Sequence, residues 1–408
     1  MFGESVIANN YYHIAELTKN LEGEVLLIAG EASGDMHGAE LIQAIKKKSP
    51  NLRFNGIGGE KMAMEGMKMM FHASEMAVIG LSEVLKKLPI VFKAYKIIKN
   101  YLKNNPPVLC ILIDYPGFNL YIAKIATRFK VPVFYYIAPQ VWAWRSGRAK
   151  KISKYVNRMA VILPFEKNFF KRYGVNVDYV GHPLADDINK ACLSNLNIID
   201  IKQSLGIAES KKPFLALIPG SRNQEVTSLL PIMIEAAEYL QKNKYPELVC
   251  LLPLAPTIEK NMILDIIQKS SVKVIVWEKD IYSLLKLCDG AIAASGTVTL
   301  QIAMMNVPMI LVYKVFPITY YIARMIIKTP YIGLVNLIAD KKIVPELIQH
   351  DVTSINIANY IIQYLEENEP RRKMIANFAY VRDLIGKPGA AENAADIALS
   401  MLFRNKAS

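Results

Sequence analysis

The sequence predicts an α/β protein of two domains in tandem, each built on a parallel sheet. Its 408 residues exceed what one hydrophobic core usually serves. Hydrophobic residues make up 52% of the chain and charged residues only 21%, so it can bury large cores and is not intrinsically disordered. Short apolar runs that suit buried strands alternate with stretches that suit helices, which is typical of parallel strands joined by crossover helices.

The first series of strands and helices begins at Glu24. The run EVLLIAG at 24–30 predicts a strand, and a Gly-rich turn separates it from the helical stretch AELIQAIKKK at 39–48. Three more apolar runs predict strands: VLCILI at 108–113, VPVFYYI at 131–137 and MAVIL at 159–163. Each lies near a stretch that suits a helix, so the first half of the chain is predicted to be α/β.

A second α/β series follows the polar segment after residue 188. Its predicted strands are FLALI at 214–218, LVCLLP at 248–253, VKVIVW at 272–277, GAIAA at 290–294 and PMILVY at 308–313. We expect a polar extension at 1–23, a first domain at 24–188, a second domain at 189–353 and helices alone at 354–408. Two such domains place a cleft between the carboxyl ends of their sheets, which suits an enzyme with two substrates.

The charge and the cysteines narrow the class of protein. Lys and Arg number 49 against 36 Asp and Glu, and a net charge of +13 attracts phosphates, anionic lipid headgroups or nucleic acid alike. The four cysteines have no metal-ligand spacing, which favours a reduced cytosolic chain without a zinc site.

Residues 1–22 lack the basic cluster and apolar core of a secretion signal. The uncharged stretch at 290–313 is interrupted by polar residues and Pro308, so it is interpreted as loop, helix and strand rather than a membrane span.

Polar residues follow the first predicted strand in AGEASGDMHG at 29–38. Glycines at such a turn let backbone N–H groups approach an anion at the N-terminus of the next helix. The candidates for ligand contact are Glu31, Ser33, Gly34 and Asp35. The alternative is a tight turn in which Ser33 or Asp35 only caps the helix. The turn matches neither a Walker A loop nor GxGxxG.

Asp114 closes the apolar strand in LIDYPGFN at 112–119. A carboxylate at the C-terminal tip of a parallel strand faces the predicted cleft, where it can take a proton from an attacking hydroxyl. The alternative is that Asp114 only caps the next helix. Asn119 is a candidate either to cap that helix or to bind a sugar. Of the five histidines, His182 lies in the distinctive GHP at the presumed domain hinge, and His37 is a candidate to face the cleft.

A turn of the second half, IPGSRNQEV at 218–226, predicts a phosphate-binding loop. The planar fork of donors on Arg222 suits a diphosphate, and the N–H groups at the start of the helix add to it. Gly220, Ser221 and Glu225 complete this candidate loop. The alternative is a surface salt bridge between Arg222 and Glu225, which stabilises little.

A second such turn is AASGTVTLQIA at 293–303. Ser295, Gly296 and Thr297 can surround a phosphate, and Gln301, one turn further on, can reach a ribose. The alternative is an ordinary helix N-cap.

A basic amphipathic stretch runs from residue 81 to residue 103. Its apolar residues draw one stripe at helical spacing, and six lysines flank that stripe against one glutamate, which suits either an anionic membrane surface or the protein core. The apolar MAVIGL at 76–81 lies directly upstream. The residues expected at a membrane are Val78, Ile79, Leu81, Val84, Leu85 and Leu88. A second basic run, from Arg145 to Arg172, follows Trp142 and Trp144 and suits a headgroup interface.

Taken in order, the motifs resemble those of the lipid-A-disaccharide synthases. The strings are GEASGDMHG, GIGGEKMAMEGM, IDYPGFN, PQVWAWR, LPFEKNFF, VGHPLAD, IPGSR, SGTVTLQ and VNLIADKKIVPELIQ, and they cover the chain from about residue 24 to residue 395. The resemblance implies the GT-B fold, in which two Rossmann-like domains face a cleft, with a helical C-terminal segment.

The resemblance also implies an inverting, metal-independent hexosyltransferase without a cofactor. Such an enzyme transfers 2,3-diacylglucosamine from its UDP ester to the 6-hydroxyl of 2,3-diacylglucosamine 1-phosphate (lipid X). The products are the β-1,6-linked lipid A disaccharide 1-phosphate and UDP, on the route to lipopolysaccharide and the outer membrane. Inversion requires a base on the face opposite UDP.

Site residues are implied position by position. Asp114 occupies the place of the family's essential aspartate, the PGSR turn with Arg222 and the Ser295–Thr297 turn match loops that contact UDP, and Asn336 matches an asparagine of a PNL-type motif. The chain departs from the pattern twice. Gly117 stands where many members have a second Asp, and Gln301 stands where Glu is usual, so a charge-assisted bond to ribose becomes a neutral one.

Partners and location follow from the same resemblance. Because both substrates carry acyl chains, we expect a peripheral enzyme on the cytoplasmic face of the inner membrane, bound through the region around 76–103. A homodimer is compatible with the sequence, and the closing helices either cover their own chain or are exchanged with a second copy. The rival classes are another GT-B enzyme acting on a UDP-sugar, a nucleic-acid-binding protein and an oxidoreductase. No stacking aromatics of a nucleic-acid module and no GxGxxG support the last two.

Overall fold

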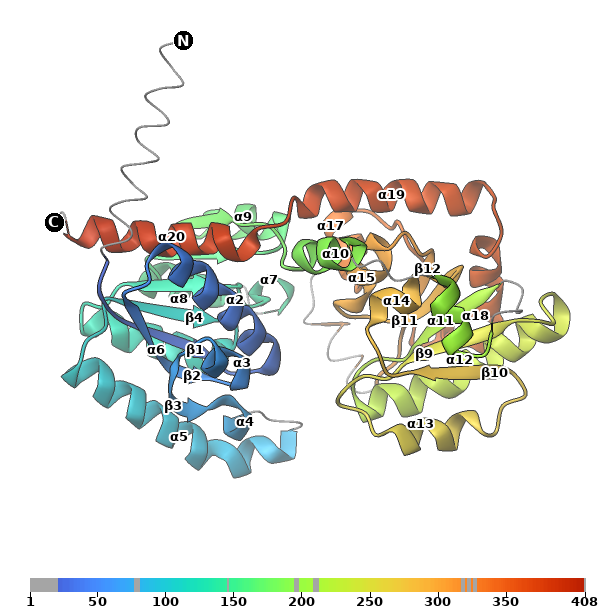
Figure 1. Ribbon diagram of the computed structural model, residues 1–408, viewed down its shortest axis with the longest axis horizontal. Coiled ribbons are helices and arrows are strands. Elements are labelled where there is room, and N and C mark those ends of the chain that lie inside the picture. The colour runs from blue at the N-terminus through green and yellow to red at the C-terminus, as the bar shows by residue number, and fades with distance from the viewer. Residues whose placement is uncertain are drawn as a thin grey trace, which may run out of the picture. The chain divides into compact units, whose positions relative to one another are not determined.

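The computed structural model describes residues 21–76, 81–144, 147–193, 198–207, 213–316, 320, 324–325 and 329–406 (Figure 1). The chain forms two compact units. The first comprises Met1–Pro183 together with Pro388–Ser408, and the second comprises Leu184–Lys387. The division after Pro183 lies close to the domain boundary expected at residue 188.

The first unit contains a parallel sheet of seven strands in the order β3-β2-β1-β4-β5-β6-β7. The strands are β1 (Gly23–Ala29), β2 (Leu52–Gly58), β3 (Lys68–His72), β4 (Leu109–Ile113), β5 (Val133–Tyr136), β6 (Arg158–Val161) and β7 (Val177–Tyr179). The strand order reverses between β1 and β4, which are neighbours in the sheet. Ligands of open α/β folds bind at such a reversal, outside the carboxyl ends of the strands.

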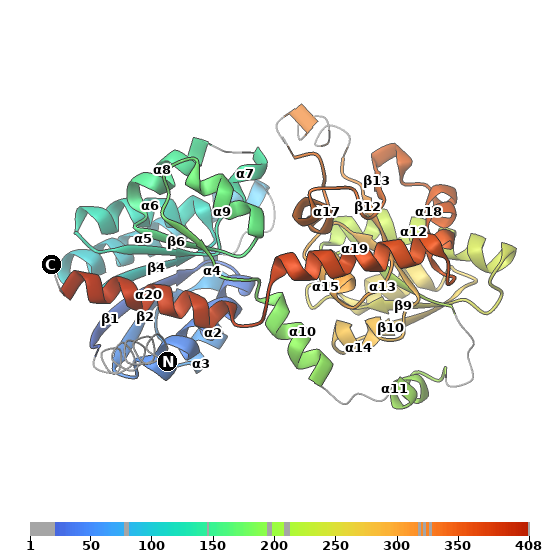
Figure 2. The same ribbon diagram turned by 90° about the horizontal axis from the view of Figure 1, so that it is seen from above.

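Helices cover both faces of this sheet (Figures 1 and 2). They are α2 (Ala32–Lys48), α3 (Glu60–Met64), α4 (Ala73–Met76), α5 (Leu81–Asn104), α6 (Pro116–Arg128), α7 (Val141–Trp144), α8 (Gly147–Tyr155), α9 (Pro164–Lys171) and α20 (Ala390–Lys406). The strands alternate between the two cores. Cys110 and Leu112 face α5, α6 and α8, whereas Leu109 and Ile111 face α2 and α20. Because both faces are buried, the central strands β4 and β5 are apolar throughout.

The second unit contains a parallel sheet of six strands in the order β10-β9-β8-β11-β12-β13. They are β8 (Phe214–Ile218), β9 (Val249–Pro253), β10 (Lys273–Trp277), β11 (Gly290–Ala294), β12 (Met309–Tyr313) and β13 (Glu346–Ile348). The first five match the predicted strands. The order reverses between β8 and β11. Because these two strands are parallel neighbours, the turns that follow them lie side by side at the carboxyl edge of the sheet.

The helices of the second unit are α10 (Leu184–Leu193), α11 (Ile198–Ser204), α12 (Asn223–Asn243), α13 (Lys260–Ile267), α14 (Ile281–Leu285), α15 (Val298–Met304), α17 (Leu334–Ala339), α18 (Ser354–Ile361) and α19 (Glu369–Ile385). Two short 3₁₀ helices, η1 (Gln349–Asp351) and η2 (Ile362–Tyr364), flank α18. Helices α12, α13 and α18 bury apolar residues against one face of the sheet. Helix α19 contacts α15 and α17.

The helices expected as one C-terminal segment are shared between the units. Helices α18 and α19 belong to the second unit, whereas α20 belongs to the first. There α20 contacts α2, and its Ala394, Ala398 and Leu402 are buried in the core. Ala394 and Ala398 are small and let α20 approach closely, so this helix completes the core of the first unit.

Helix α5 divides its apolar stripe between two environments. Ala94, Ile98 and Leu102 are buried in the core. Leu88 and Phe92 are 53% and 56% exposed. Val78 and Ile79 lie outside the described residues, as do the side chains of Leu81, Val84 and Leu85. None of the helices in the described ranges is long and apolar enough to cross a membrane.

Candidate active site

Asp114 lies directly after β4, at the carboxyl edge of the first unit's sheet. Its φ is +43° and that of Tyr115 is +46°, so two successive residues other than glycine adopt the left-handed conformation. This conformation is costly for residues with a side chain, and it persists where surrounding contacts hold it. The N–H of Asp114 donates to the carbonyl of Ile137 at 3.2 Å. The backbone of this turn is therefore held in place by the sheet next to it.

Buried side chains hold the same turn from within. The amide nitrogen of Asn119 donates to the carbonyl oxygens of Ile113 and Asp114, at 3.0 and 2.8 Å. The hydroxyl of Tyr135 also donates to the Asp114 carbonyl. Across the turn, a Cβ on Gly30 would lie 2.4 Å from the ring of Tyr115, so only glycine fits there. Asn119 thus supports the Asp114 turn, and within the described residues its buried Oδ1 has no hydrogen-bond partner.

The carboxyl of Asp114 is a stronger base than an ordinary aspartate. Burial is the largest cause, and the charge of Glu31 adds to it; together they raise the pKa of Asp114 from 3.8 to about 6. A hydrogen bond from the backbone of Tyr115 and the charge of His37 partly oppose this rise in pKa. A group with this pKa is mostly ionised at neutral pH and is basic enough to serve in proton transfer.

Glu166 is a second buried carboxyl near Asp114, and sequence reasoning assigned it no role. Its side chain accepts hydrogen bonds from the indole N–H of Trp142 at 2.9 Å and from the N–H of Leu163 at 3.1 Å. Burial, with a smaller contribution from the charge of Asp114, raises the pKa of Glu166 to about 8. The sequence contains Glu166 in the motif LPFEKNFF, but only the fold shows that this side chain is buried.

The AGEASGDMHG turn separates into exposed and buried parts. Glu31 and Ser33 are exposed. Gly34 is buried against the strands, where an added Cβ would lie 3.1 Å from the Cβ of Ala29. Of this turn, Glu31 and His37 are the residues whose charges act on Asp114: Glu31 raises its pKa and His37 lowers it.

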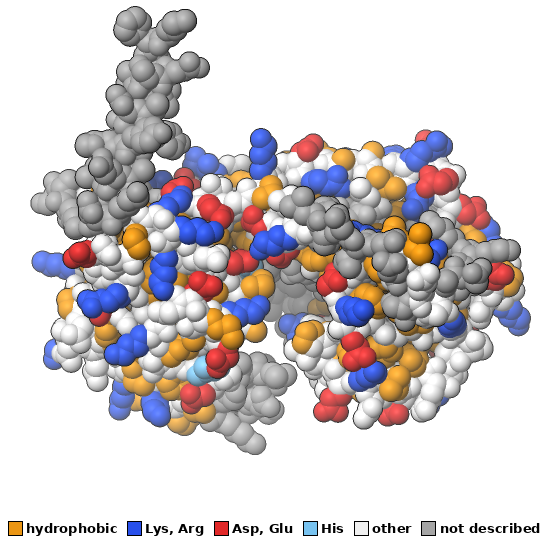
Figure 3. All heavy atoms as spheres, viewed as in Figure 1, with side chains coloured by type: hydrophobic (Ala, Val, Ile, Leu, Met, Phe, Trp, Pro, Cys, Tyr) orange, Lys and Arg blue, Asp and Glu red, His pale blue; other side chains and the backbone are white. Residues whose placement is uncertain are grey.

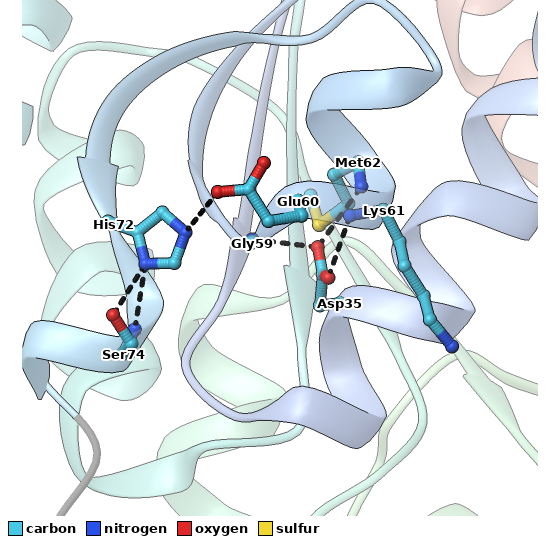
Figure 4. Close-up of polar contacts among 7 residues, drawn as sticks. All are labelled: Asp35, Gly59, Glu60, Lys61, Met62, His72 and Ser74. Atoms are coloured by element: carbon cyan, nitrogen blue, oxygen red, sulfur yellow. Dashed lines mark hydrogen bonds and ion pairs between the residues drawn. The ribbon is translucent and has the colours of Figure 1, made fainter.

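Asp35 has a different role from the ligand contact predicted for it. Its carboxylate accepts hydrogen bonds from the N–H groups of Gly59, Lys61 and Met62, at 2.7, 3.1 and 3.1 Å (Figure 4). These are the free donors at the start of α3. Asp35 therefore caps a helix, as the alternative interpretation held, but the helix is α3 and not its own α2.

The segment after α3 is tied down beside this cap. The ring of His72, at the end of β3, lies between the carboxylate of Glu60 and the hydroxyl of Ser74 (Figure 4). Its Nε2 lies 3.4 Å from Glu60, and its Nδ1 lies 2.6 Å from the Ser74 Oγ. This link connects α3 to α4, which directly precedes residue 77.

His182 is buried near the end of the first unit. Burial, with a smaller effect of the charge of His37, lowers the pKa of His182 to about 4. The imidazole is therefore neutral at physiological pH.

In the second unit, the turn after β8 is organised by Glu225. Its carboxylate accepts the N–H of Ser221 at 3.1 Å and pairs with Arg222 at 2.7 Å. Gly220 has φ +109°, and a Cβ there would lie 2.3 Å from the Glu225 carboxylate. The predicted salt bridge is therefore present, yet the Arg222 side chain is 77% exposed and can still meet a ligand.

A pocket of about 550 Å³ adjoins this turn within the second unit. Its lining includes Arg222, Glu225, Tyr313, Lys314 and Phe316. Two cations, one of them paired with Glu225, and two aromatic rings in one concave site suit an anionic ligand with a flat group.

The turn after β11 leaves open space at Gly296, where no atom lies within 4 Å of an added Cβ. The Ser295 hydroxyl donates to the carbonyl of Ile332 at 3.0 Å, and Thr297 is the N-cap residue of α15 without a side-chain cap bond. The amide of Gln301 donates to the hydroxyl of Tyr282 at 3.1 Å. Gln301 therefore has one internal partner already, and its carbonyl oxygen can accept from a ligand.

Asn336 is fully buried, so its geometry favours an indirect role rather than the UDP contact predicted for it. Its Oδ1 accepts the N–H groups of Ile343 and Val344, and its Nδ2 donates to the Val344 carbonyl and to Glu346. The Glu346 carboxylate also accepts the N–H groups of Ile332 and Gly333. Asn336 thus supports, through Glu346, the segment that receives the Ser295 hydroxyl.

The charged groups outside these turns are described by two observations, one on metal-binding clusters and one on the face shown in Figure 3. In the ranges that the structure describes, no three His, Cys, Asp or Glu residues gather in a metal-binding group. On the face shown in Figure 3, Lys and Arg side chains are spread over the described surface and alternate with Asp and Glu.

Comparison with known proteins assigns the chain to a family. The family described as lipid-A-disaccharide synthetase matches residues 25–399. The lipid-A-disaccharide synthase of Geobacter sulfurreducens is 41% identical over 386 residues, which cover 95% of this chain and 99% of the relative. That of Coxiella burnetii (strain Dugway 5J108-111) is 40% identical over 380 residues, covering 93% and 98%.

Solved structures show the fold. A UDP-GlcNAc 2-epimerase from Neisseria meningitidis, bound to UDP-GlcNAc, matches with a TM-score of 0.62 at 14% identity and covers 94% of this chain and 100% of its own. The calicheamicin glycosyltransferase CalG4 matches with a TM-score of 0.57 at 12% identity, covering 94% and 99%. Both have the GT-B arrangement expected from the sequence. With this fold, and with relatives about 40% identical over nearly its whole length, the chain belongs to the lipid-A-disaccharide synthase family of glycosyltransferases.

Proposed function

We propose that Asp114 is the base in the reaction of this family. The reaction transfers 2,3-diacylglucosamine from its UDP ester to the 6-hydroxyl of 2,3-diacylglucosamine 1-phosphate. As the 6-hydroxyl oxygen attacks the anomeric carbon, Asp114 accepts its proton, the C–O bond to UDP breaks, and UDP leaves with the bonding electron pair. Attack from the face opposite UDP inverts the anomeric centre and gives the β-linkage.

The observation that carries this proposal is the environment of the Asp114 carboxyl. It sits at the tip of a central strand, in a turn held by Asn119 and Tyr135, with its pKa raised to about 6. A rigid turn fixes the direction of the carboxylate, and the raised pKa increases its strength as a base while leaving it mostly ionised.

The donor is proposed to bind the second unit through its two turns at one sheet edge. Arg222 supplies a guanidinium for the diphosphate, and the open backbone around Gly296 admits a phosphate close to the chain. Gln301 is proposed to accept a hydrogen bond from the ribose. A neutral amide binds a hydroxyl less strongly than a carboxylate does, so this contact contributes less than one from Glu.

The acceptor is proposed to bind the first unit near Glu31, Ser33 and Asp114. The exposed Leu88 and Phe92 on α5 are the described residues that support contact with the lipid surface. Peripheral binding at the cytoplasmic face of the inner membrane and a homodimer belong to the same proposal. Flotation with anionic vesicles and analytical ultracentrifugation test these two points.

The test of the base is the Asp114→Asn variant, assayed by mass spectrometry of products from both acylated precursors. Asn keeps the size of the side chain but does not accept the proton, so we expect kcat to fall by about 10²–10⁴-fold. Asp383→Asn, an exposed position of the second unit, is the matched control. Unchanged thermal unfolding would show that the variant is folded, and full activity in it would reject Asp114 as the base.

A further inference from the structure

A basic pocket lies beside the Asp114 turn and has no role in the function described so far. It has a volume of about 400 Å³, and its lining residues come from α6 and α8 of the first unit. These two helices contact each other (Figure 2). Its charged lining residues are Lys124, Arg148, Lys150, Lys151 and Lys154, and no Asp or Glu lines it. The second basic run of the sequence therefore contributes four of its cations to one concave site.

The two helices present these residues because of the faces that they bury. Ala149 and Ile152 anchor α8 in the core, which leaves its lysines on the outer side. On α6, Gly117, Tyr121 and Lys124 recur at spacings of four and three and line the pocket, so they share one face of that helix. The hydroxyl of Thr127 on α6 donates to the carbonyl of Tyr155 at 3.3 Å, which joins the C-terminal ends of the two helices.

The charges of the four pocket lysines, Lys124, Lys150, Lys151 and Lys154, are not neutralised by ion pairs among the described residues. Four lysines of one sign around a concave surface repel each other and focus a positive potential there. A multiply charged anion relieves that repulsion, and a phosphate monoester carries close to two negative charges at neutral pH.

The position of the pocket indicates which phosphate it can bind. Pro116 and Gly117, in the first turn of α6, line it and stand two and three residues after Asp114. One helical turn spans about 5.4 Å, which is comparable with the width of a sugar ring. A sugar that places its 6-hydroxyl at Asp114 can thus extend its 1-phosphate towards α8. The rings of Tyr121 and Tyr155 add apolar surface for the sugar itself.

We propose that the α6–α8 pocket binds the 1-phosphate of the acceptor and so orients its 6-hydroxyl towards Asp114. This inference rests on the proposed function, because it takes the acceptor to be a glucosamine 1-phosphate bound by the first unit. The pocket then distinguishes acceptor from donor. The acceptor ends in a phosphate monoester, whereas the diphosphate of the donor is esterified to the sugar at one end and to uridine at the other.

The test compares acceptors with and without the phosphate in a double variant, Lys151→Ala/Lys154→Ala. In the wild type, removal of the 1-phosphate from diacylglucosamine 1-phosphate should raise the acceptor KM at least about tenfold, because charge-assisted hydrogen bonds are lost. In the double variant, the acceptor KM should already be raised, and removal of the phosphate should have little further effect. The KM for the UDP donor should not change.

Two control variants separate a phosphate site from a general effect of charge. Lys47→Ala/Lys68→Ala removes the same charge from exposed positions of the first unit and should behave as the wild type does. Lys151→Arg/Lys154→Arg keeps the charge and should restore much of the acceptor KM. An equal phosphate dependence in the wild type and in Lys151→Ala/Lys154→Ala would overturn the proposal.

Two direct measurements identify the source of the phosphate and separate this inference from the proposed function. Titration with water-soluble glucosamine 1-phosphate should show binding to the wild type and at least about tenfold weaker binding to Lys151→Ala/Lys154→Ala, whether or not transfer occurs. If that variant instead loses only its binding to phosphatidylglycerol vesicles, with glucosamine 1-phosphate bound as before, the pocket is a headgroup site and the inference is wrong. Absence of transfer by the wild type, with the sugar phosphate still bound in the pocket, would refute the proposed function alone.

Discussion

Replacing Glu166 with Gln is expected to flatten the pH dependence of the stability of the first unit. The Glu166 side chain is buried, at 1% exposure, and its pKa is raised from 4.5 to about 8. The folded state therefore holds this proton more tightly than the unfolded state does. The stabilisation from Glu166 is fully present below pH 4.5 and is lost as the pH rises through about 8.

The size of the effect follows from these two pKa values. Between pH 5 and pH 7, a carboxyl with pKa 4.5 unfolded and about 8 folded lowers the free energy of unfolding by roughly 2.5 kcal/mol. The Gln variant lacks this titration. Its amide accepts from the indole of Trp142 but cannot also accept from the N–H of Leu163, so we expect an additional, pH-independent loss of about 1–3 kcal/mol.

The assay is urea unfolding at pH 5, 6 and 7, followed by tryptophan fluorescence. Glu75→Gln, at an exposed position, is the matched control and should keep the wild-type slope against pH. The difference in unfolding free energy between wild type and the Glu166→Gln variant should change by roughly 2.5 kcal/mol over this range. Parallel pH dependences for the two proteins would refute the reasoning, because Glu166 would then be ionised in the fold as in the unfolded chain.

A neutral Glu166 also matters for the proposed base. At pH 7 a carboxyl with pKa about 8 is mostly protonated, so it adds little negative charge beside Asp114. Asp114, with the lower pKa of about 6, is the carboxyl of this pair that ionises first. The deeper burial of Glu166 gives it the higher pKa, so at neutral pH Glu166 keeps its proton while Asp114 is ionised and can accept one.

The remaining predictions concern catalysis, the donor and the membrane. The kcat/KM should rise with pH through about 6 as Asp114 ionises. Glu31→Gln should move this rise to lower pH, because the Glu31 charge raises the Asp114 pKa, and an unmoved rise would contradict the effect of Glu31 on Asp114. Arg222→Ala should raise the donor KM about tenfold or more while leaving the acceptor KM unchanged, and an unchanged donor KM would remove Arg222 from the UDP site. Replacing the exposed Leu88 and Phe92 with Ser should release the protein from sedimenting anionic vesicles, and undiminished binding would count against α5 as the contact.

The central strands were predictable because parallel strands buried on both faces are apolar throughout. All nine runs identified in the sequence correspond to strands in the structure, from β1 to β12. The four strands missed were β2, β3, β7 and β13. Strand β2 includes Arg53 and Asn55 and two glycines, and the other three are short strands at sheet edges. Such strands lack a continuous apolar run, so only pairing with their neighbours identifies them.

The candidate site was predictable at the level of position but not of role. Asp114 and Arg222 stand at strand ends, where the sequence alone indicates functional side chains. Asp35 and Asn336 make contacts that the sequence does not indicate. Asp35 accepts hydrogen bonds from residues at the start of α3, and Asn336 bonds to the segment around Val344. Their motifs indicate polar residues at turns, and no local pattern tells whether a polar group meets a ligand or the backbone of another segment.

By itself, the sequence determined the α/β class, most of the strands, the membership of the family and the carboxylate at the end of β4. These properties depend on the residue types within short windows and on their order along the chain. The tertiary structure decided the raised pKa of Asp114, the burial of Glu166, the return of α20 to the first unit and the gathering of lysines between α6 and α8. Each of these arises from residues distant in sequence that folding brings into contact, since burial and electrostatic coupling depend on distances in space.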